Sequence, residues 1–437
     1  MKKITESAFD SEAKWPADGR RPKIAFFDYP DVFEDFYPHY GVDQHSFGTT
    51  WQNTANHAWL KLVQRHVGDV TWFVTCLKTD LTESFHQTIG CQVRFYPSSW
   101  LHRQLWRLFY GPSMAWRWRS YYRLYAVIAS YLAPLSWPLW RGLVSLRPDV
   151  LFVQDYCSGR YDVLLLVSKL LKIPLITFHS GSTEEKYLGK AMKSFTIPRA
   201  AVLFPSGKSE MSRLQNRYGI SSSRLFILRP PLDATVFSIL DRTTCCEHFG
   251  LDRKRRYLLF FGRLDDSVKR ISSIICQFSL LAEDFQDFDL VIAGSGRDHA
   301  ELVGLSNRIL PGRVHFMGWI AEDQRKAMLY NTADCMVLAS WREASPAVIG
   351  EAFACGTPVV SSDVGGISDL VKDDVSGWLF PAGDDDSLLR CLSKVMSNAG
   401  QIAAMRPLVR EMATKLVSNE VVGETLKNGF DSVMGNK

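Results

Sequence analysis

The chain has 437 residues, more than one hydrophobic core usually serves, so we expect two domains. Hydrophobic residues make up 46% of the sequence and charged residues 22%, which is ordinary for a globular protein and excludes a largely disordered chain. The net charge is +5, yet residues 1–235 carry 29 Lys and Arg against 19 Asp and Glu, and the remainder carries 22 against 27. A basic first half indicates an anionic partner or surface there, unless the asymmetry is chance drift between two domains.

The nine cysteines are scattered without a C-x-x-C pair, which argues against a disulfide framework or a zinc site and for a reducing cytoplasm. Residues 1–23 contain no apolar segment of the kind a signal peptide needs. The longest uncharged apolar run, 124–140, is too short for a bilayer span and contains two prolines. We therefore expect a cytoplasmic protein, with peripheral attachment to the inner face of the plasma membrane as a further hypothesis.

Short apolar runs rich in Val, Ile and Phe recur along the chain, with longer amphipathic stretches between them. Their apolarity is continuous rather than alternating, which is typical of strands buried on both faces of a parallel sheet. Alternation of such strands with helices predicts an α/β fold with two doubly wound, Rossmann-like sheets. The expected strands are 23–29, 70–74, 93–96, 150–154, 175–179 and 201–204 in the first half, and 257–261, 289–294, 314–318, 335–340 and 358–362 in the second.

Two prolines near residue 230 mark the expected domain boundary. We expect a first domain at 1–235, a second at 236–415, and a helix at 416–437 that can pack back on the first. Ligands of open parallel sheets bind beyond the carboxyl ends of the strands, and two such sheets facing each other form a cleft. The residues that follow each strand are therefore the candidates for a site.

Two cations follow the strand at 257–261. We expect Gly262 to turn the chain sharply, Arg263 to leave the strand end, and Lys269 to lie one short loop further on. A planar guanidinium and a mobile ammonium at a strand's carboxyl end suit a diphosphate, whereas a solvated loop with charges flanking a helix is the alternative. A second turn, "GSGRDH" at 294–299, lacks the third glycine of G-x-G-x-x-G, which disfavours a nicotinamide site.

The stretch "SPAVIGEAFACGTP" predicts a helix whose start binds an anion. Ser345 is a suitable N-cap and Pro346 fits the first helical position, so the helix should run from Ala347 to about Cys355. A glycine and a proline then end it. The free N–H groups of Ala347 and Val348, together with the helix dipole, would form the anion site.

Two glutamates flank this helix start. Glu343 lies just before the helix and Glu351 inside it, so they cannot form an i,i+4 pair. Glu343 could be an ordinary surface acid. Glu351 is flanked by Gly350 and Ala352 in an apolar helix, and an unpaired buried carboxylate is costly. Glu351 therefore needs a partner, which the two hydroxyls of a ribose would supply.

The first half holds two further candidate sites. His179 ends the strand at 175–179 and precedes a turn of small residues, where it is either structural or part of a site. Gly41 and Gly48 precede a helical run and predict a phosphate- or acceptor-binding loop.

Residues 84–148 contain no acid, eight arginines and six of the thirteen tryptophans. Interfacial helices and nucleic-acid surfaces both mix Arg with aromatic residues in this way. A helix layer with arginines on its solvent face is the alternative. The length of the acid-free run favours an anionic membrane surface or an anionic acceptor, and we expect no nucleic-acid partner.

Taken in order, these motifs resemble the retaining GT-B glycosyltransferases of glycosyltransferase family 4. The agreement in order and spacing is strongest over 257–380 and is weaker but continuous over 148–237. Before residue 148 only the first strand and the 41–48 loop agree. The motifs are "FFGRLDDSVKR", "LVIAGSG", "VHFMGW", "SPAVIGEAFACGTPVV", "DVGGISDLV" and "SGWLF", with E-x7-E as the most specific pattern.

The resemblance implies a nucleotide-sugar donor held by the second domain and a glycan or lipid acceptor held by the first. On that pattern Arg263 and Lys269 would bind the diphosphate, and Glu351 the ribose. Glu343 and the N–H groups after Pro346 would meet the donor sugar and the distal phosphate. The second domain would thus carry most of the donor site.

By the same resemblance His179 would lie beside the donor sugar. The chain also departs from the family pattern. Lys269-Arg270 stands where the family often has Lys-Gly, a Pro-Pro-Leu-Asp at 230–233 replaces Asn-Gly-Val-Asp, and the Gly-Gly-x-x-Glu motif ends here in Asp369. These departures concern the linker and a secondary contact more than the donor site.

The expected reaction is a front-face displacement with retention, in which the leaving phosphate accepts the acceptor's proton. Fixed cations would stabilise the leaving diphosphate, so we expect no metal and no other cofactor. The Asp-x-Asp cluster at 384–386 is interpreted as the start of a helix. Two alternatives stay open: a hydrolase or phosphorylase that uses Glu343 and Glu351 as acid and nucleophile, and a degenerate domain pair that only binds a partner.

Overall fold

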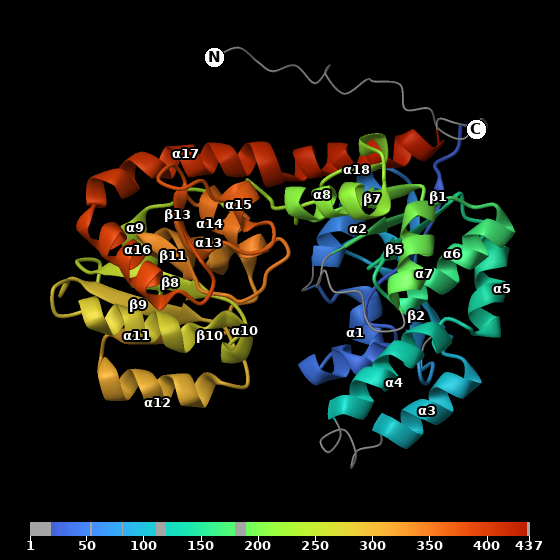
Figure 1. The fold of residues 1–437 in the computed structure, drawn as a ribbon, viewed down its shortest axis with the longest axis horizontal. Coiled ribbons are helices and arrows are strands. Elements are labelled where there is room, and N and C mark those ends of the chain that lie inside the picture. The colour runs from blue at the N-terminus through green and yellow to red at the C-terminus, as the bar shows by residue number, and fades with distance from the viewer. Residues whose placement is uncertain (1–18, 53–54, 81, 111–118, 180–188, 435–437) are drawn as a thin grey trace.

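Two parallel sheets, each covered by helices, organise the protein in the computed structural model (Figure 1). The structure describes residues 19–52, 55–80, 82–110, 119–179 and 189–434. Among these residues no helix combines the length and the apolar character that a membrane crossing requires. The two sheets lie side by side, and the last two helices run along one edge of both (Figure 1).

The first sheet has the strand order β3-β4-β2-β1-β5-β6-β7, and every pairing is parallel except that of β3 with β4. All six strands expected in this half are present. The additional edge strand β3 has a single buried residue among four, so its sequence lacks the apolar run that marked the others. The strands are β1 Lys23–Phe27, β2 Asp69–Cys76, β3 Glu83–His86, β4 Cys91–Pro97, β5 Val150–Gln154, β6 Leu175–Phe178 and β7 Val202–Phe204.

Helices cover both faces of the first sheet. One face buries Trp59 of α2 in the same core cluster as Phe26 and Phe152, and the other face buries Leu143 of α5 with Leu164 of α6. The helices are α1 Gln44–Thr49, α2 Ala55–His66, α3 Trp100–Tyr110, α4 Arg119–Leu132, α5 Trp137–Leu146, α6 Gly159–Leu171, α7 Gly189–Thr196 and α8 Lys208–Tyr218, with 3-10 turns at Phe33–Asp35, Tyr37–Tyr40, Ile197–Arg199 and Ser222–Arg224.

The second sheet has the order β10-β9-β8-β11-β12-β13, with parallel pairing throughout. All five strands expected in this half are present, and a sixth, β13, occupies the edge. Its run "GWLF" is mostly buried, but we did not predict it as a strand. The strands are β8 Arg256–Phe261, β9 Phe288–Ala293, β10 Val314–Gly318, β11 Cys335–Leu338, β12 Val359–Ser362 and β13 Gly377–Phe380.

The helices of the second unit share one core cluster with its strands. They are α9 Arg242–His248, α10 Asp266–Lys269, α11 Ile271–Leu281, α12 His299–Ile309, α13 Asp323–Thr332, α14 Ala347–Ala354, α15 Ile367–Leu370, α16 Asp385–Ser397 and α17 Ala399–Val417. Asp384 caps α16 by accepting a 2.9 Å hydrogen bond from the Ser387 amide, so the 384–386 cluster does start a helix.

The last helix, α18 (Asn419–Met434), returns to the first unit and packs on α2 and β7. Val422, Leu426 and Phe430 are buried in the core of that unit. At the crossing, the Leu232 amide donates to the Val417 carbonyl at 2.9 Å, and the Leu232 carbonyl accepts from the Asn419 amide at 3.1 Å. The chain therefore crosses from one unit to the other twice, and the two crossing segments lie side by side.

The carboxyl ends of the two sheets face each other. Asp369 of α15, which follows β12, accepts a 2.5 Å hydrogen bond from the amide of Lys208, which follows β7. The Arg229 guanidinium also lies 3.9 Å from the Asp369 carboxylate. The position where the family pattern expects Glu thus contacts the opposite unit in this chain.

Candidate active site

Arg263 lies at the carboxyl end of β8 and extends toward solvent. Its guanidinium is 3.7 Å from the carboxylate of Asp265, a weak pairing that leaves most of the donors of Arg263 free for a ligand. The following short helix α10 ends at Lys269. The two predicted diphosphate ligands therefore belong to one turn at the edge that faces the first unit.

The chain bends at Gly262, as we expected, but the close backbone approach in this turn involves Gly294. A Cβ at Gly262 would meet only ordinary contacts at 3.5 Å, and its backbone does not have a positive φ. Gly294 has φ +142°, and a Cβ there would lie 1.8 Å from the Gly262 carbonyl oxygen. The "GSG" turn after β9 therefore packs directly on the backbone that carries Arg263.

Lys269 and Glu343 form an ion pair between the loops that follow β8 and β11. The side chains are 18% and 10% exposed, so the pair is largely withdrawn from solvent. The Ser340 hydroxyl donates to the same Glu343 oxygen at 2.8 Å. The surface-acid alternative for Glu343 is therefore wrong, because its side chain is largely withdrawn from solvent and its carboxylate is paired.

The glycine pair after β12 fixes the backbone of Glu343. Gly365 has φ +60°, and a Cβ there would lie 1.8 Å from the Glu343 carbonyl oxygen. The Gly366 amide donates to the Ala344 carbonyl at 2.9 Å. The Gly-Gly motif thus acts by allowing two loops to touch, and a side chain at either position would separate them.

Helix α14 begins and ends close to the predicted positions. Pro346, with extended backbone at φ −70° and ψ 118°, is the N-cap, so Ser345 lies one residue outside the helix and is not its cap as we expected. The N–H groups of Ala347 and Val348, at the start of the first turn, have no carbonyl partner inside the helix. The last helical residue is Ala354, and Gly356 follows with φ +75°.

Glu351 extends from α14 toward α13. The Tyr330 hydroxyl donates to Glu351 Oε2 at 2.8 Å, and burial raises the pKa of Glu351 against the opposing influence of nearby Lys326. The structure thus supplies a protein partner for a carboxylate that the sequence left unpaired. Tyr330 had no sequence signal, because only helix packing brings it to Glu351.

His179 follows β6, and its ring is buried beside Asp155, which follows β5. Nδ1 of His179 lies 3.2 Å from Oδ1 of Asp155, while Nε2 is buried without a hydrogen-bond partner in the described structure. Burial pushes the pKa of His179 down, but the hydrogen bond and charge of Asp155 outweigh it and raise that pKa. Burial likewise opposes ionisation of Asp155, yet His179 and the Cys157 amide lower its pKa to about 2.

Other polar residues at this edge were missed by the sequence analysis. Asp28, directly after β1, is buried and accepts from the Trp72 indole at 2.9 Å, and burial raises its pKa to about 6. The buried Arg160 of α6 pairs with Asp31 at 2.9 Å. Asp28 and Asp31 follow a strand, and Arg160 lies at the start of a helix. These positions in the chain were the only sequence signal that the residues belong to a site.

Asp155, Cys157 and His179 also offer ligand atoms that all lie within 4.8 Å of one another. A metal would bind Cys157 as the thiolate, but burial raises the pKa of this thiol and so disfavours that form. The carboxylate and the imidazole already satisfy each other. We therefore interpret the cluster as a hydrogen-bonded pair next to a buried thiol.

Gly48 does not lie in a loop, which corrects our expectation. It is a buried residue of α1, its carbonyl accepts from the Ser84 hydroxyl at 2.9 Å, and a Cβ would lie 2.3 Å from that oxygen. The glycine is needed where α1 packs on the edge strand β3. This packing explains Gly48 without a phosphate or an acceptor, so its position does not support the role we expected.

Arg270, which replaces the glycine of the family pattern, has φ +51°. Its guanidinium lies 4.7 Å from the centre of the Trp341 ring and 2.7 Å from the Asp385 carboxylate. A left-handed backbone costs a non-glycine residue about 1 kcal/mol or more. These two contacts offset that cost and keep the turn after Lys269 in the shape a glycine would give.

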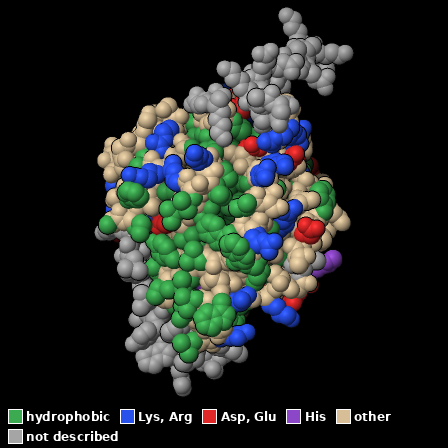
Figure 2. Space-filling model, turned by 90° about the vertical axis from the view of Figure 1, so that its right-hand side faces the viewer, with side chains coloured by type: hydrophobic (Ala, Val, Ile, Leu, Met, Phe, Trp, Pro, Cys, Tyr) green, Lys and Arg blue, Asp and Glu red, His purple; other side chains and the backbone are tan. Residues whose placement is uncertain are grey.

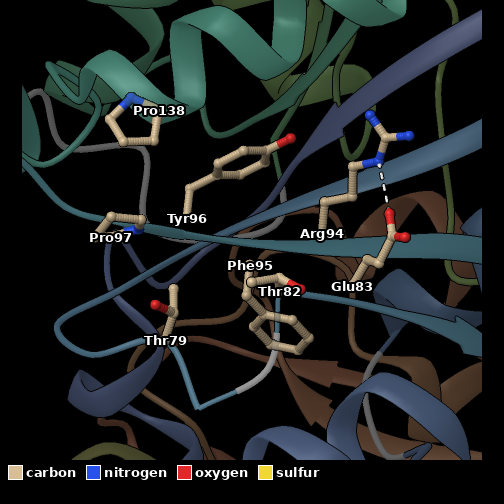
Figure 3. A pocket seen from close by; sticks show the side chains of 8 residues that line it. All are labelled: Thr79, Thr82, Glu83, Arg94, Phe95, Tyr96, Pro97 and Pro138. Atoms are coloured by element: carbon tan, nitrogen blue, oxygen red, sulfur yellow. Dashed lines mark ion pairs between the residues drawn. The ribbon is translucent and has the colours of Figure 1, made fainter.

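The acid-free segment forms β4, α3, α4 and α5, with 111–118 outside the described residues. A hollow of about 420 Å³ lies between β4 and α5, at the carboxyl end of the first sheet. Figure 3 shows the side chains that line it. Arg94 and Glu83 line it as a loose ion pair at 3.8 Å, and Tyr96 and Pro138 close its other side. The hollow therefore lies in the unit for which the resemblance implies an acceptor.

Comparison with known proteins agrees with this architecture. Residues 255–398 match the family model of the glycosyl transferases group 1. The D-inositol 3-phosphate glycosyltransferase of Mycolicibacterium gilvum is 29% identical over 57% of this chain and 59% of its own length. The enzyme of that name from Xylanimonas cellulosilytica is 28% identical over 64% of this chain and 70% of its own length. For the enzyme of that name from Rhodococcus jostii, the chain spans 54% of its length at 25% identity.

Solved structures resemble nearly the whole chain. HepE of Anabaena in complex with UDP gives a TM-score of 0.67 at 15% identity, covering 92% of this chain and 98% of that one. Sucrose-phosphate synthase of Thermosynechococcus elongatus gives 0.69 at 16% identity, covering 95% and 100%. The fold is thus GT-B, with two Rossmann-like domains, as the sequence predicted.

Proposed function

We propose that the protein is a retaining glycosyltransferase that moves a sugar from a nucleoside diphosphate sugar to an acceptor hydroxyl. The observation that carries the proposal is the convergence of Arg263, Lys269 and Glu343 at the carboxyl edge of the second sheet, beside the start of α14. A group with two negative phosphates suits two cations and free helix N–H groups. The match of this domain to glycosyl transferases group 1 supports the same conclusion.

In the proposed reaction the donor diphosphate leaves as the bond to the sugar breaks. Arg263 and Lys269 stabilise the negative charge that develops on it, and the amides of Ala347 and Val348 bind its distal phosphate. Lys269 is already held in place by Glu343, so it needs little reorganisation when the donor arrives. These fixed charges are the reason we propose a reaction that requires no metal ion.

Glu351 binds the ribose hydroxyls of the donor, and the Tyr330 hydroxyl keeps its carboxylate oriented. His179 presents Nε2 toward the donor sugar, and Asp155 holds its other nitrogen. The acceptor hydroxyl attacks from the face that the diphosphate leaves, and the leaving phosphate takes the acceptor's proton. This path gives retention without a covalent enzyme intermediate.

UDP- and GDP-sugars are the proposed donors, and UDP is supported by HepE, whose structures contain UDP and UDP-glucose. The acceptor is proposed to belong to glycolipid, exopolysaccharide or cell-surface glycan synthesis. The basic, aromatic segment of the first unit is consistent with an acceptor presented at a membrane, so we also propose peripheral attachment at the cytoplasmic face.

A hydrolase with Glu343 and Glu351 as its catalytic pair is not favoured. Such carboxyls must both address one glycosidic bond, whereas Glu343 is paired with Lys269 and Glu351 with Tyr330. Incubation with a nucleotide sugar, with and without acceptor, separates the reactions. Transfer to the acceptor supports the proposal, and release of free sugar as the sole product contradicts it.

The first experiment is a thermal-shift panel with UDP, GDP and ADP and their sugars. We expect stabilisation by UDP or GDP, and no shift with any nucleotide would favour a degenerate binding module instead. NMR of the product then gives the configuration at the anomeric carbon, where inversion would refute the mechanism. Undiminished turnover after chelation is expected if no metal takes part.

A further inference from the structure

Helices α5, α6 and α7 expose apolar side chains on one side of the first unit. Figure 2, which views this side, shows hydrophobic side chains gathered across it with Lys and Arg around them. Trp137 and Leu170 are each 73% exposed and Leu166 is 63% exposed. We name this surface the α5–α7 face; its exposed apolar residues are Leu135, Trp137, Val144, Leu166, Leu170, Leu171, Met192 and Phe195.

The α5–α7 face is additional to the hydrophobic core. The inner sides of the same helices already bury Leu139 and Leu143 of α5 and Leu164 and Leu165 of α6 against the first sheet. A surface helix of a globular protein usually carries polar residues on its outer side. An exposed apolar surface formed by three neighbouring helices therefore indicates a partner that covers it.

The face is hollowed beside α5. A groove of about 660 Å³ is lined by Leu135, Trp137, Trp140, Arg141, Val144 and Ser145. The Trp140 indole N–H is satisfied by the Pro134 carbonyl at 2.9 Å, so its ring contributes an apolar wall. Aromatic rings with a cation beside them are typical of surfaces that meet the boundary between lipid headgroups and acyl chains.

Figure 2 shows Asp and Glu as well as Lys and Arg on this side, but the exposed charges that belong to the three helices have one sign. Along α5, α6 and α7 and the turns that follow them, the exposed charged side chains of the described residues are Arg141, Arg147, Lys169, Lys172 and Arg199. The acids of this region are not exposed: Asp162 is buried against Lys193 at 2.8 Å, and Asp149 pairs with Arg20 at 2.7 Å. A partner for this face must therefore be apolar within and negative at its surface.

We propose that the α5–α7 face docks the protein on an anionic lipid bilayer. Trp137, Leu166 and Leu170 enter the zone between headgroups and acyl chains, and the surrounding cations meet the negative headgroups. A second copy of this chain fits less well, because a symmetric dimer through this face would place cation against cation. This proposal assigns a surface to the peripheral attachment proposed above and rests on that part of the proposed function, whereas the nucleotide-sugar site does not depend on it.

The docked face connects to the candidate site through α6. This helix begins directly after Asp155, whose carboxylate holds His179, and its outer side carries Leu166 and Leu170. Docking would therefore hold the acceptor edge of the first sheet at a fixed height above the bilayer.

The test is sedimentation of the full chain with vesicles of phosphatidylcholine, alone or with about 30% phosphatidylglycerol. We expect binding to the anionic vesicles that weakens as salt is raised. The double variant Leu166→Asp/Leu170→Asp should lower the partition coefficient at least about tenfold, because two exposed leucines no longer transfer from water. Lys169→Glu/Lys172→Glu should weaken binding to the anionic vesicles and leave the residual binding to neutral ones unchanged.

Leu280→Asp is the matched control, because Leu280 lies on α11 of the second unit and is 64% exposed. It should bind vesicles like the parent protein. Three results would overturn the proposal: a parent protein that stays in the supernatant at low salt, face variants that bind normally, or a dimer that the Leu166→Asp/Leu170→Asp change converts to monomer without any vesicle binding. UDP-induced thermal stabilisation is measured on the same proteins. Stabilisation by UDP without vesicle binding would refute the docking and leave the proposed donor site intact.

Discussion

Replacement of Arg263 by alanine separates catalysis from stability in this protein. The side chain is 60% exposed and its ion pair with Asp265 spans 3.7 Å, so its loss should change the free energy of unfolding by less than about 1 kcal/mol. If Arg263 stabilises the departing diphosphate, the same change should lower kcat about 100-fold, because removal of one preorganised electrostatic contact costs about 2.7 kcal/mol in the transition state. The two effects differ enough to be distinguished without ambiguity.

The assay is initial-rate transfer at saturating nucleotide sugar, with urea unfolding measured in parallel. Arg253→Ala is the control, since Arg253 is 61% exposed and pairs at 3.8 Å with Glu247, yet lies before β8 at the opposite end of its sheet. We expect near-normal turnover for the control. Near-normal turnover for Arg263→Ala, or an equal loss in both variants, would refute the assignment of Arg263 to the diphosphate.

Three further predictions follow from the same geometry. The low pKa of Asp155 and the raised pKa of His179 mean that their pairing stabilises the fold most between about pH 4 and 6.5. Asp155→Asn should therefore lower the free energy of unfolding by about 1–3 kcal/mol at pH 5.5, and by less as pH rises through the pKa of His179. A loss that does not change with pH would contradict the pairing. Gly294→Ala should lower the free energy of unfolding by roughly 3 kcal/mol or more, whereas Gly304→Ala inside α12 should raise it by about 0.5–1 kcal/mol. Thermal unfolding of both variants measures this difference, and equal effects would show that the close contact at Gly294 is wrong. Glu351→Gln should weaken UDP binding at least about tenfold, measured by calorimetry. It should not lower the free energy of unfolding above neutral pH, because a buried carboxylate with a raised pKa is unfavourable there. An unchanged affinity for UDP would show that Glu351 does not bind the ribose.

The sequence by itself determined the strands and therefore the fold. Runs such as "VLFV" and "YLLFF" are apolar at every position. A strand with such a run is stable only when both faces of its sheet are buried. The helix after Pro346 was also determined locally, because a proline, an apolar run and a glycine specify its two ends. The edge strand β3 was not, since a strand with one buried residue among four has no such run. The run "GWLF" of β13 is mostly buried, but we did not predict it as a strand.

The tertiary structure decided which side chains meet. Lys269 and Glu343 are 74 residues apart, and their pairing depends on β8 and β11 being neighbours in the sheet. The choice of Gly294 over Gly262 for the tight contact, and of Tyr330 as the partner of Glu351, likewise depends on how loops and helices from different segments pack. The α5–α7 face gathers residues from three separate helices. A sequence specifies local backbone preference and burial, whereas contacts between distant segments exist only once the sheets and helices have assembled.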